Sequence, residues 1–177
     1  MSAPPPRRRN IRLPEKHYLG QRAYFVTICS AKRKRLFLDA ARAQWTLARL
    51  REIAAARPFA VHSYCLMPDH LHLLVRGLSA SSDLLSFVHR FKSATAQDEK
   101  QATGRALWQR YFYDHILRPR DSGIAVAWYI WLNPVRAGLC RTPEEYPLSG
   151  SFTGEWPVRK RTIIAWMPPW KTKGRAG

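Results

Sequence analysis

The stretch FAVHSYCLMPDHLHLLV, residues 59–75, decides the fold of this chain. Residues 59–67 alternate in the way a strand does, and residues 70–75 form a second apolar run of strand length. Between them, Pro68 and Asp69 are residues that favour a tight turn. The stretch therefore predicts a β-hairpin.

The sequence before the hairpin predicts a strand and a helix. Residues 22–29 (RAYFVTIC) are aromatic and β-branched, as in a buried strand. Asp39 is a suitable N-cap for a helix that continues to about Arg57, where Pro58 prevents further helix. Its apolar stripe, including Leu50, indicates a face that packs against a core.

The sequence after the hairpin predicts two more helices and one more strand. A helix begins at Ser82 or Asp83, and the polar stretch 96–105 is expected to be a loop. The aromatic run 108–117 (WQRYFYDHIL) predicts a strand. A third helix is expected over 123–132, apolar on nearly every side and ended by an Asn-Pro pair.

This order of elements predicts an α+β domain of the ferredoxin-like kind, with helices packed on one face of a mainly antiparallel sheet. A chain of 177 residues fits one such domain. We expect a flexible basic arm over 1–16, the domain itself over 17–150, and a basic tryptophan-containing tail over 151–177. The tail carries Trp156, Trp166 and Trp170 among basic residues, a composition that fits either base stacking or loose docking.

The composition indicates the class of partner. Lys and Arg number 30 against 12 acidic residues, which gives a formal net charge of +18 and a pI near 10.8. Such an excess favours a polyanion. No apolar run of about 18 residues suits a membrane helix, and no signal-like segment begins the sequence. We therefore expect a cytoplasmic, nucleoid-associated protein that binds nucleic acid and no membrane.

Two basic clusters are candidates for phosphate contacts. One lies in the predicted arm and the other directly follows the first predicted strand. Their residues are Arg7, Arg8, Arg9, Lys32, Arg33, Lys34 and Arg35. The cysteines, by contrast, number three and are widely spaced without a CxxC pair, so we expect buried thiols in a reducing compartment.

Two histidines, His70 and His72, interrupt the apolar centre of the second hairpin strand. Alternate side chains of a strand share a face, so these imidazoles lie about 6 to 7 Å apart at the backbone. Polar side chains in such a place need partners, and one shared metal ion satisfies both. A pair of surface histidines is the alternative interpretation.

The third predicted helix carries Tyr129 and Asn133, which are four residues apart and therefore share a helix face. If that face packs toward the histidines, the Asn133 amide oxygen can complete a metal site beside the Tyr129 hydroxyl. The alternative is that Tyr129 is an ordinary core aromatic.

Several stretches resemble the HUH single-tyrosine transposases, specifically the REP-associated tyrosine transposases of bacteria. They are MPDHLHLLV at 67–75, WQRYFYDHILR at 108–118 and YIWLNPVRAGL at 129–139, together with YFVTICSAKRKRLF at 24–37. These motifs occur in the same order as in the family. The resemblance covers most of residues 18–140.

The resemblance implies an HUH nuclease fold that cuts and rejoins single-stranded palindromic hairpin DNA. His70 and His72 match the family's metal-binding pair, and Tyr129 matches its nucleophile. Asn133 matches a third ligand that is glutamine in some relatives. The product implied is a 5′-phosphotyrosine linkage with a free 3′-hydroxyl. The working protein is then a monomer or a homodimer.

A site of two imidazoles and one amide is expected to accept Mn²⁺ readily and Mg²⁺ adequately. Tyr111 and Tyr113 are rival nucleophiles in the preceding segment. Asp69 and Asp114 are near the motifs, but the sequence selects neither as a general base. Two other functions stay open: a protein that binds hairpin DNA or RNA without cutting it, and a hydrolase that uses metal-activated water.

Overall fold

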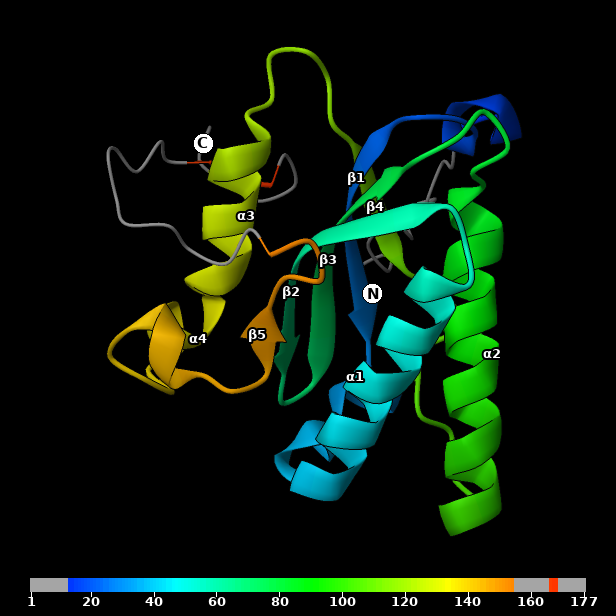
Figure 1. Cartoon of the computed structure of the whole chain (residues 1–177). Coiled ribbons are helices and arrows are strands. Elements are labelled where there is room, and N and C mark those ends of the chain that lie inside the picture. The colour runs from blue at the N-terminus through cyan, green and yellow to red at the C-terminus, as the bar shows by residue number, and fades with distance from the viewer. Residues whose placement is uncertain (1–12, 155–165, 169–177) are drawn as a thin grey trace, which may run out of the picture.

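The computed structural model describes residues 13–154 and 166–168 (Figure 1). In this part of the chain, a five-stranded antiparallel sheet lies between helices that pack on both of its faces. The predicted α+β class with an antiparallel sheet is confirmed.

The sheet has the strand order β4-β1-β3-β2-β5. Its strands are β1 (Ala23–Cys29), β2 (Phe59–Met67), β3 (His70–Gly77), β4 (Tyr113–Ile116) and β5 (Ser149–Gly150). Met67 pairs with His70 across the Pro68-Asp69 turn, so the predicted hairpin is confirmed. The hairpin places β3 at the centre of the sheet, between β1 and β2.

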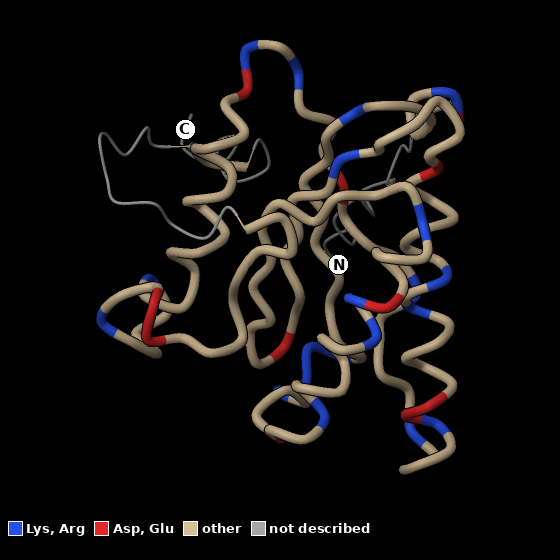
Figure 2. The backbone as a smooth tube through the Cα atoms, in the orientation of Figure 1, with Lys and Arg blue, Asp and Glu red and all other residues tan. Residues whose placement is uncertain are grey.

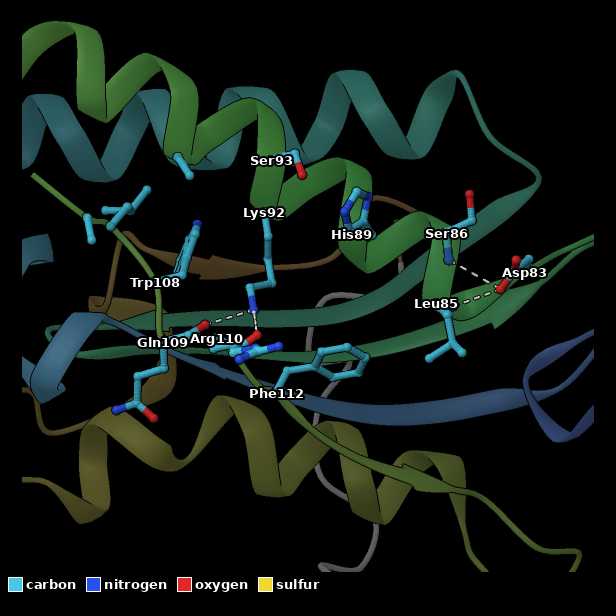
Figure 3. A pocket seen from close by; sticks show the side chains of 13 residues that line it. Asp83, Leu85, Ser86, His89, Lys92, Ser93, Trp108, Gln109, Arg110 and Phe112 are labelled. Atoms are coloured by element: carbon cyan, nitrogen blue, oxygen red, sulfur yellow. Dashed lines mark hydrogen bonds between the residues drawn. The ribbon is translucent and has the colours of Figure 1, made fainter. Parts of the chain in front are cut away.

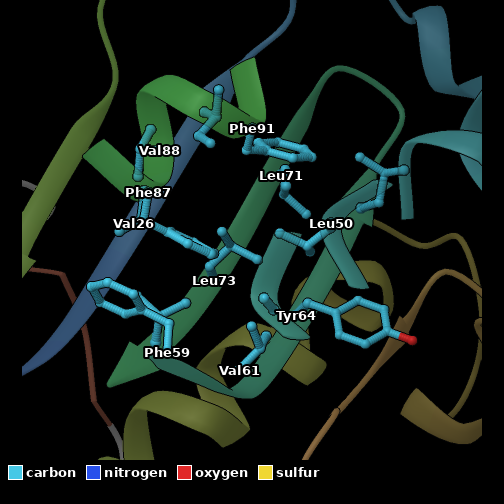
Figure 4. Packing of buried hydrophobic residues seen from close by; sticks show 14 of the residues in the cluster. Val26, Leu50, Phe59, Val61, Tyr64, Leu71, Leu73, Phe87, Val88 and Phe91 are labelled. Atoms are coloured by element: carbon cyan, nitrogen blue, oxygen red, sulfur yellow. The ribbon is translucent and has the colours of Figure 1, made fainter. Parts of the chain in front are cut away.

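Helices α1 (Ala40–Ala55) and α2 (Leu84–Thr103) pack on one face of the sheet. Both begin at aspartate N-caps: the Asp39 carboxylate accepts a hydrogen bond from the Arg42 amide, and Asp83 accepts from the Leu85 and Ser86 amides. Figure 4 shows the apolar cluster beneath them, which includes Val26, Leu50, Phe59, Leu71, Leu73 and Phe91. This core holds the sheet in place.

Helix α3 (Gly123–Trp131) covers the opposite face, where it packs against Phe25 and Leu74. The expectation that the helices share one face therefore holds for α1 and α2 but not for α3. Every residue of α3 from Ala125 onward is buried, which accounts for its apolar character on nearly all sides.

The predicted loop at residues 96–105 is wrong, because α2 continues to Thr103. The buried Glu99 carboxylate accepts a hydrogen bond of 2.8 Å from Arg42 Nε of α1. Interhelical ion pairing of this kind explains why a polar segment is helical here. Gly104, with φ of +68°, then ends the helix in the left-handed conformation.

The predicted strand at residues 108–117 is shorter than expected, since only Tyr113–Ile116 form β4. Trp108 makes a single bridge with Ser30, and its indole donates instead to Thr95 Oγ1 of α2 at 2.8 Å. The Trp108 side chain thus belongs to the core beneath α1 and α2.

The Asn-Pro pair lies after α3, at the start of a further short helix. A short helix, α4 (Asn133–Arg136), begins there with Pro134 in its first turn, where the missing amide hydrogen costs no hydrogen bond. The prediction that the third helix ends at the Asn-Pro pair is confirmed, since α3 ends at Trp131 with Leu132 as its C-cap, and α4 is a separate helical turn.

Short 3-10 helices occupy several connections: η1 (Glu15–Tyr18), η2 (Ala31–Arg33), η3 (Leu36–Leu38) and η4 (Pro143–Glu145). The last two residues of the predicted basic arm belong to η1, whereas residues 1–12 lie outside the described part. Among the described residues, no helix has the length and apolar character needed to cross a membrane.

Candidate active site

A cavity of about 530 Å³ lies between the sheet and the chain around α3 and α4. The four residues predicted for the catalytic site all line it, although they come from β3, α3 and α4. They are His70, His72, Tyr129 and Asn133, and the lining also includes Thr27 and Arg136. The fold thus brings the candidate nucleophile and the candidate metal ligands together.

The strand register explains why the histidines meet this cavity. His72 pairs with Thr27 on one side and Cys65 on the other, while His70 pairs with Cys29 and Met67. Paired residues of an antiparallel sheet project to the same face. These two rows therefore lie on the α3 face, and the intervening Leu71 and Leu73 belong to the opposite core.

The two imidazoles face each other, with 3.0 Å between His70 Nε2 and His72 Nε2. Each ring is held from behind: His70 Nδ1 lies 2.6 Å from Asp69 Oδ1, and His72 Nδ1 lies 2.8 Å from Thr27 Oγ1. The Asp69 carboxylate accepts a hydrogen bond from Nδ1–H of His70, and the lone pair of that ring is then on Nε2. The arrangement therefore directs ring nitrogens toward one point.

This geometry fits a bound divalent cation. The two Nε2 atoms are 3.0 Å apart, and imidazole nitrogens are common ligands of divalent transition-metal ions, so His70 and His72 would hold the ion together. The supporting contacts from Asp69 and Thr27 are of the type that orients metal-binding histidines. Among the described residues, no group of three His, Cys, Asp or Glu side chains is placed to hold a metal ion.

Asp69 lies between the side chains of Arg33 and His70. Its Oδ2 lies 3.3 Å from Arg33 Nη1, and its Oδ1 contacts His70. Partial burial acts to raise the pKa of Asp69, but the hydrogen bond from His70 and the charge of Arg33 outweigh it and lower that pKa. Asp69 is therefore an orienting carboxylate for His70, and its engagement argues against a general-base role.

Tyr129 lies in the last turn of α3 and is only 6% exposed. Its ring centroid is 6.2 Å from that of His72, 5.9 Å from that of Phe25 and 5.1 Å from that of Trp166. The side chain therefore stands between the histidine pair and an aromatic cluster. Trp166 comes from the predicted tail, whose other tryptophans, at 156 and 170, lie outside the described residues.

Arg136 is a site residue that the sequence analysis missed. Its guanidinium carbon is 4.4 Å from the centre of the Tyr129 ring, and Nη2 donates to the Tyr129 carbonyl oxygen at 2.5 Å. Burial lowers the pKa of Arg136, and attraction to the Tyr129 hydroxyl opposes that effect. Arginine keeps its charge at neutral pH, so this cation lies beside the candidate nucleophile.

Asn133 occupies the cavity wall one turn after Tyr129. Its Nδ2 donates to the carbonyl oxygens of Tyr129 and Ile130, at 2.9 and 3.3 Å. Because the amide nitrogen bonds within the helix, the amide oxygen is the end of the side chain that suits a cation. Its role as a third ligand remains a prediction.

The rival tyrosines differ in their positions. Tyr113 also lines the cavity, but burial raises its pKa to about 12, with a smaller effect from Asp114. Tyr111 is 58% exposed and does not line this cavity. Asp114 pairs with Val26, a residue of the α1 and α2 face, so its side chain points away from the site.

The predicted basic loop follows β1 and borders the site at one point. Arg33 lines the cavity, and both Lys32 and Arg33 have positive φ, near +55°. Lys34 and Arg35 continue the loop into η3. Figure 2 marks it as one of several basic stretches along the chain. The other predicted cluster, Arg7, Arg8 and Arg9, lies outside the described residues.

The cysteines are free thiols, as expected, but only Cys65 is fully buried. Cys29 and Cys140 are partly exposed, which corrects the expectation that all are buried.

Residues 20–130 match a family model described as "Transposase IS200 like". The chain is 22% identical over 136 residues to a REP-associated tyrosine transposase of Escherichia coli, a match that covers 76% of this chain and 79% of the relative. It is 27% identical over 159 residues to an uncharacterised protein of Haemophilus influenzae, covering 72% and 88%.

The fold is similar to that of a solved REP-associated tyrosine transposase bound to a REP hairpin. That comparison has a TM-score of 0.67 at 21% identity and covers 84% of this chain and 91% of the other. The family match spans more than half of the chain, and the chain belongs to the IS200-like transposase family. Its similarity to REP-associated tyrosine transposases, expected from the motifs, is confirmed.

Proposed function

We propose that this protein nicks and rejoins single-stranded hairpin DNA, with Tyr129 as the nucleophile and His70, His72 and Asn133 as ligands of a divalent cation. Membership of a transposase family supports an enzymatic activity. The related protein bound to a REP hairpin supports palindromic hairpin DNA as the substrate.

The observation that carries the proposal is the convergence of the histidine pair and Tyr129 on one cavity. The two Nε2 atoms are 3.0 Å apart, and the His72 and Tyr129 rings are 6.2 Å apart. A phosphate held at the histidines would therefore share this cavity with the Tyr129 side chain. Arg136 adds a positive charge on the same side, where it stabilises a developing phenolate.

The reaction is an in-line exchange at phosphorus. The Tyr129 hydroxyl oxygen loses its proton and forms a bond to phosphorus, while the bond from phosphorus to the 3′ oxygen breaks and that oxygen takes up a proton. The 5′-phosphate is then joined to Tyr129. Attack by a 3′-hydroxyl reverses these steps and rejoins the strand without ATP.

The residues of the chain prepare this exchange. His70 and His72, whose Nδ1 atoms contact Asp69 and Thr27, would hold the cation through their Nε2 atoms. A bound Mn²⁺ or Mg²⁺ supplies Lewis-acid chemistry, in that it withdraws charge from the phosphate oxygens. Arg33, which also lines the cavity, is suited to contact the phosphate backbone.

The test is denaturing electrophoresis of the full-length protein with hairpin DNA labelled at its 5′ or 3′ end, in the presence of Mn²⁺. We expect a covalent adduct with the 3′-labelled strand only, and loss of that adduct in Tyr129→Phe. Tyr113→Phe is the matched control, since it removes a hydroxyl from the same cavity and leaves the proposed nucleophile. Cleavage without an adduct in Tyr129→Phe would instead indicate an activated water, and an adduct that persists there would indicate Tyr113 as the nucleophile.

One observation favours a second candidate, a protein that binds hairpin DNA or RNA without cutting it. Tyr129 is only 6% exposed, and Trp166 packs against its ring. If the wild type retains hairpin DNA in native gels but forms no adduct or product with Mn²⁺ or Mg²⁺ across several palindromes, this binding function replaces the catalytic one.

A further inference from the structure

A second cavity, of about 600 Å³, lies between α2 and the segment that leads into β4. It is separate from the candidate active site, with no lining residue in common. Figure 3 shows Lys92 extending from α2 to the segment that carries Gln109 and Arg110, with Phe112 beside it. The volume falls in the range of about 300–1,000 Å³ that small-molecule sites occupy.

The walls of this cavity are held by specific contacts. Lys92 Nζ donates to the carbonyl oxygens of Gln109 and Arg110, both at 2.8 Å (Figure 3). The indole of Trp108, which is buried at the base of the cavity, donates to Thr95. These bonds join the segment 108–110 to α2, so the cavity is preorganised.

The lining combines an aromatic surface with polar and cationic groups. Phe112 is half-buried and lies near the Lys92 ammonium, which is 5.9 Å from its ring centre. His89, Ser93 and Arg110 are exposed. Asp83 also lines the cavity, but its carboxylate accepts hydrogen bonds from the first turn of α2. Aromatic rings beside cations are the usual composition of sites for unpaired nucleotides.

The segment between Gln109 and Tyr113 separates this cavity from the candidate active site. Phe112 lines the second cavity, whereas the next residue, Tyr113, lines the first. The Gln109 amide also donates to the carbonyl oxygen of Cys29, a residue of the active-site wall, at 2.9 Å. A DNA strand that leaves the active site across this edge of the β-sheet therefore arrives at the second cavity.

We propose that the second cavity binds an unpaired nucleotide of the substrate strand, with its base against Phe112 and its phosphate near Arg110 and His89. This inference rests on the proposed function in that the ligand is the DNA that reaches Tyr129. The formal charge of +18 favours an anionic ligand of this kind. The nucleotide belongs to the single-stranded flank on the 5′ or the 3′ side of the hairpin.

The test measures binding to full-length protein carrying Tyr129→Phe, so that it does not depend on cleavage. Hairpin DNA with an unpaired flank on one side contains 2-aminopurine at successive flank positions. We expect quenching at one position of one flank when protein is added, and recovery of fluorescence with Phe112→Leu. The flank that responds identifies the source of the nucleotide.

Ser93→Tyr fills the cavity from an exposed position of α2 and is expected to weaken binding of the flanked hairpin by about tenfold, the loss of one base stack. A hairpin without flanks should bind unchanged. Gln97→Tyr is the matched control, because Gln97 is exposed on the same helix and does not line the cavity. Equal affinities for Ser93→Tyr and Gln97→Tyr, or quenching that Phe112→Leu does not alter, would overturn the proposal.

Discussion

The two faces of the central sheet are built from the same strands, because alternate residues of each strand project to opposite faces. In β1, Tyr24, Val26 and Ile28 enter the core beneath α1 and α2, whereas Thr27 and Cys29 line the cavity on the α3 side. The first face is closed by two long helices. The second is covered in part by one short helix, beside which a cavity lined by Thr27, His70 and His72 adjoins Tyr129. Because side chains alternate between the two faces of a β-strand, the residues of the α1 and α2 core and the residues of the candidate active site lie on opposite faces of the sheet.

The largest expected effect comes from removing chemistry on the α3 face. His72→Ala takes away one imidazole of the facing pair, and we expect formation of the covalent DNA adduct to fall about 1,000-fold, as for loss of a principal electrostatic group. Initial rates of adduct formation with Mn²⁺ measure this. A rate near that of the wild type would show that the chemistry does not depend on this face.

Leu73, the residue after His72, tests the face of the sheet that packs against α1 and α2. Leu73→Ala removes a fully buried side chain from the α1 and α2 core, and the free energy of unfolding should fall by about 2–5 kcal/mol. Denaturant unfolding measures the loss. The adduct rate per folded molecule should remain within a few-fold of the wild type. A selective loss of rate without loss of stability would contradict the division between the faces.

The ion pair between α1 and α2 should contribute less. Glu99→Gln removes the closer of the two carboxylates that pair with the partly buried Arg42, and we expect a loss of about 1–2 kcal/mol in unfolding free energy. Asp98→Asn is the comparison, since its partner Arg49 is more exposed and the expected loss is below about 1 kcal/mol. The reverse ranking would refute our explanation for the length of α2.

A substitution at Thr27 tests whether its contact with His72 orients the imidazole, while His72 itself is kept. Thr27→Val keeps the shape of the side chain but removes the oxygen 2.8 Å from His72 Nδ1. We expect Mn²⁺ affinity, measured calorimetrically, to weaken about tenfold. Unchanged affinity would mean that packing against Phe25, whose ring centre is 5.3 Å from that of His72, suffices to orient the imidazole.

The smallest effect is expected at Ser63, near the irregularity in β2. Its hydroxyl is buried and has no hydrogen-bond partner within the described residues. Ser63→Ala should therefore be neutral or stabilise the protein by up to about 1 kcal/mol in thermal unfolding. A clear destabilisation would indicate that this hydroxyl has a partner in solution, such as a buried water.

Much of the fold could be predicted because its signals are local. The hairpin follows from alternation around Pro68-Asp69, and Asp39 and Asp83 cap the helices that follow them. The histidine pair and Tyr129 could be singled out by spacing, and the family motifs related them to one another. Arg136 left no comparable signal, since an arginine in a basic sequence is unremarkable until its contact with Tyr129 is known.

By itself, the sequence determined the strand and helix periodicities and the family, because these depend on neighbouring residues or on ordered motifs. Tertiary structure alone decided that α3 packs on the opposite face, that α2 extends to Thr103, and that a second cavity forms between α2 and the segment that leads into β4. These features depend on contacts such as Arg42 with Glu99, 57 residues apart. Contacts between residues so distant leave no periodic pattern in the chain.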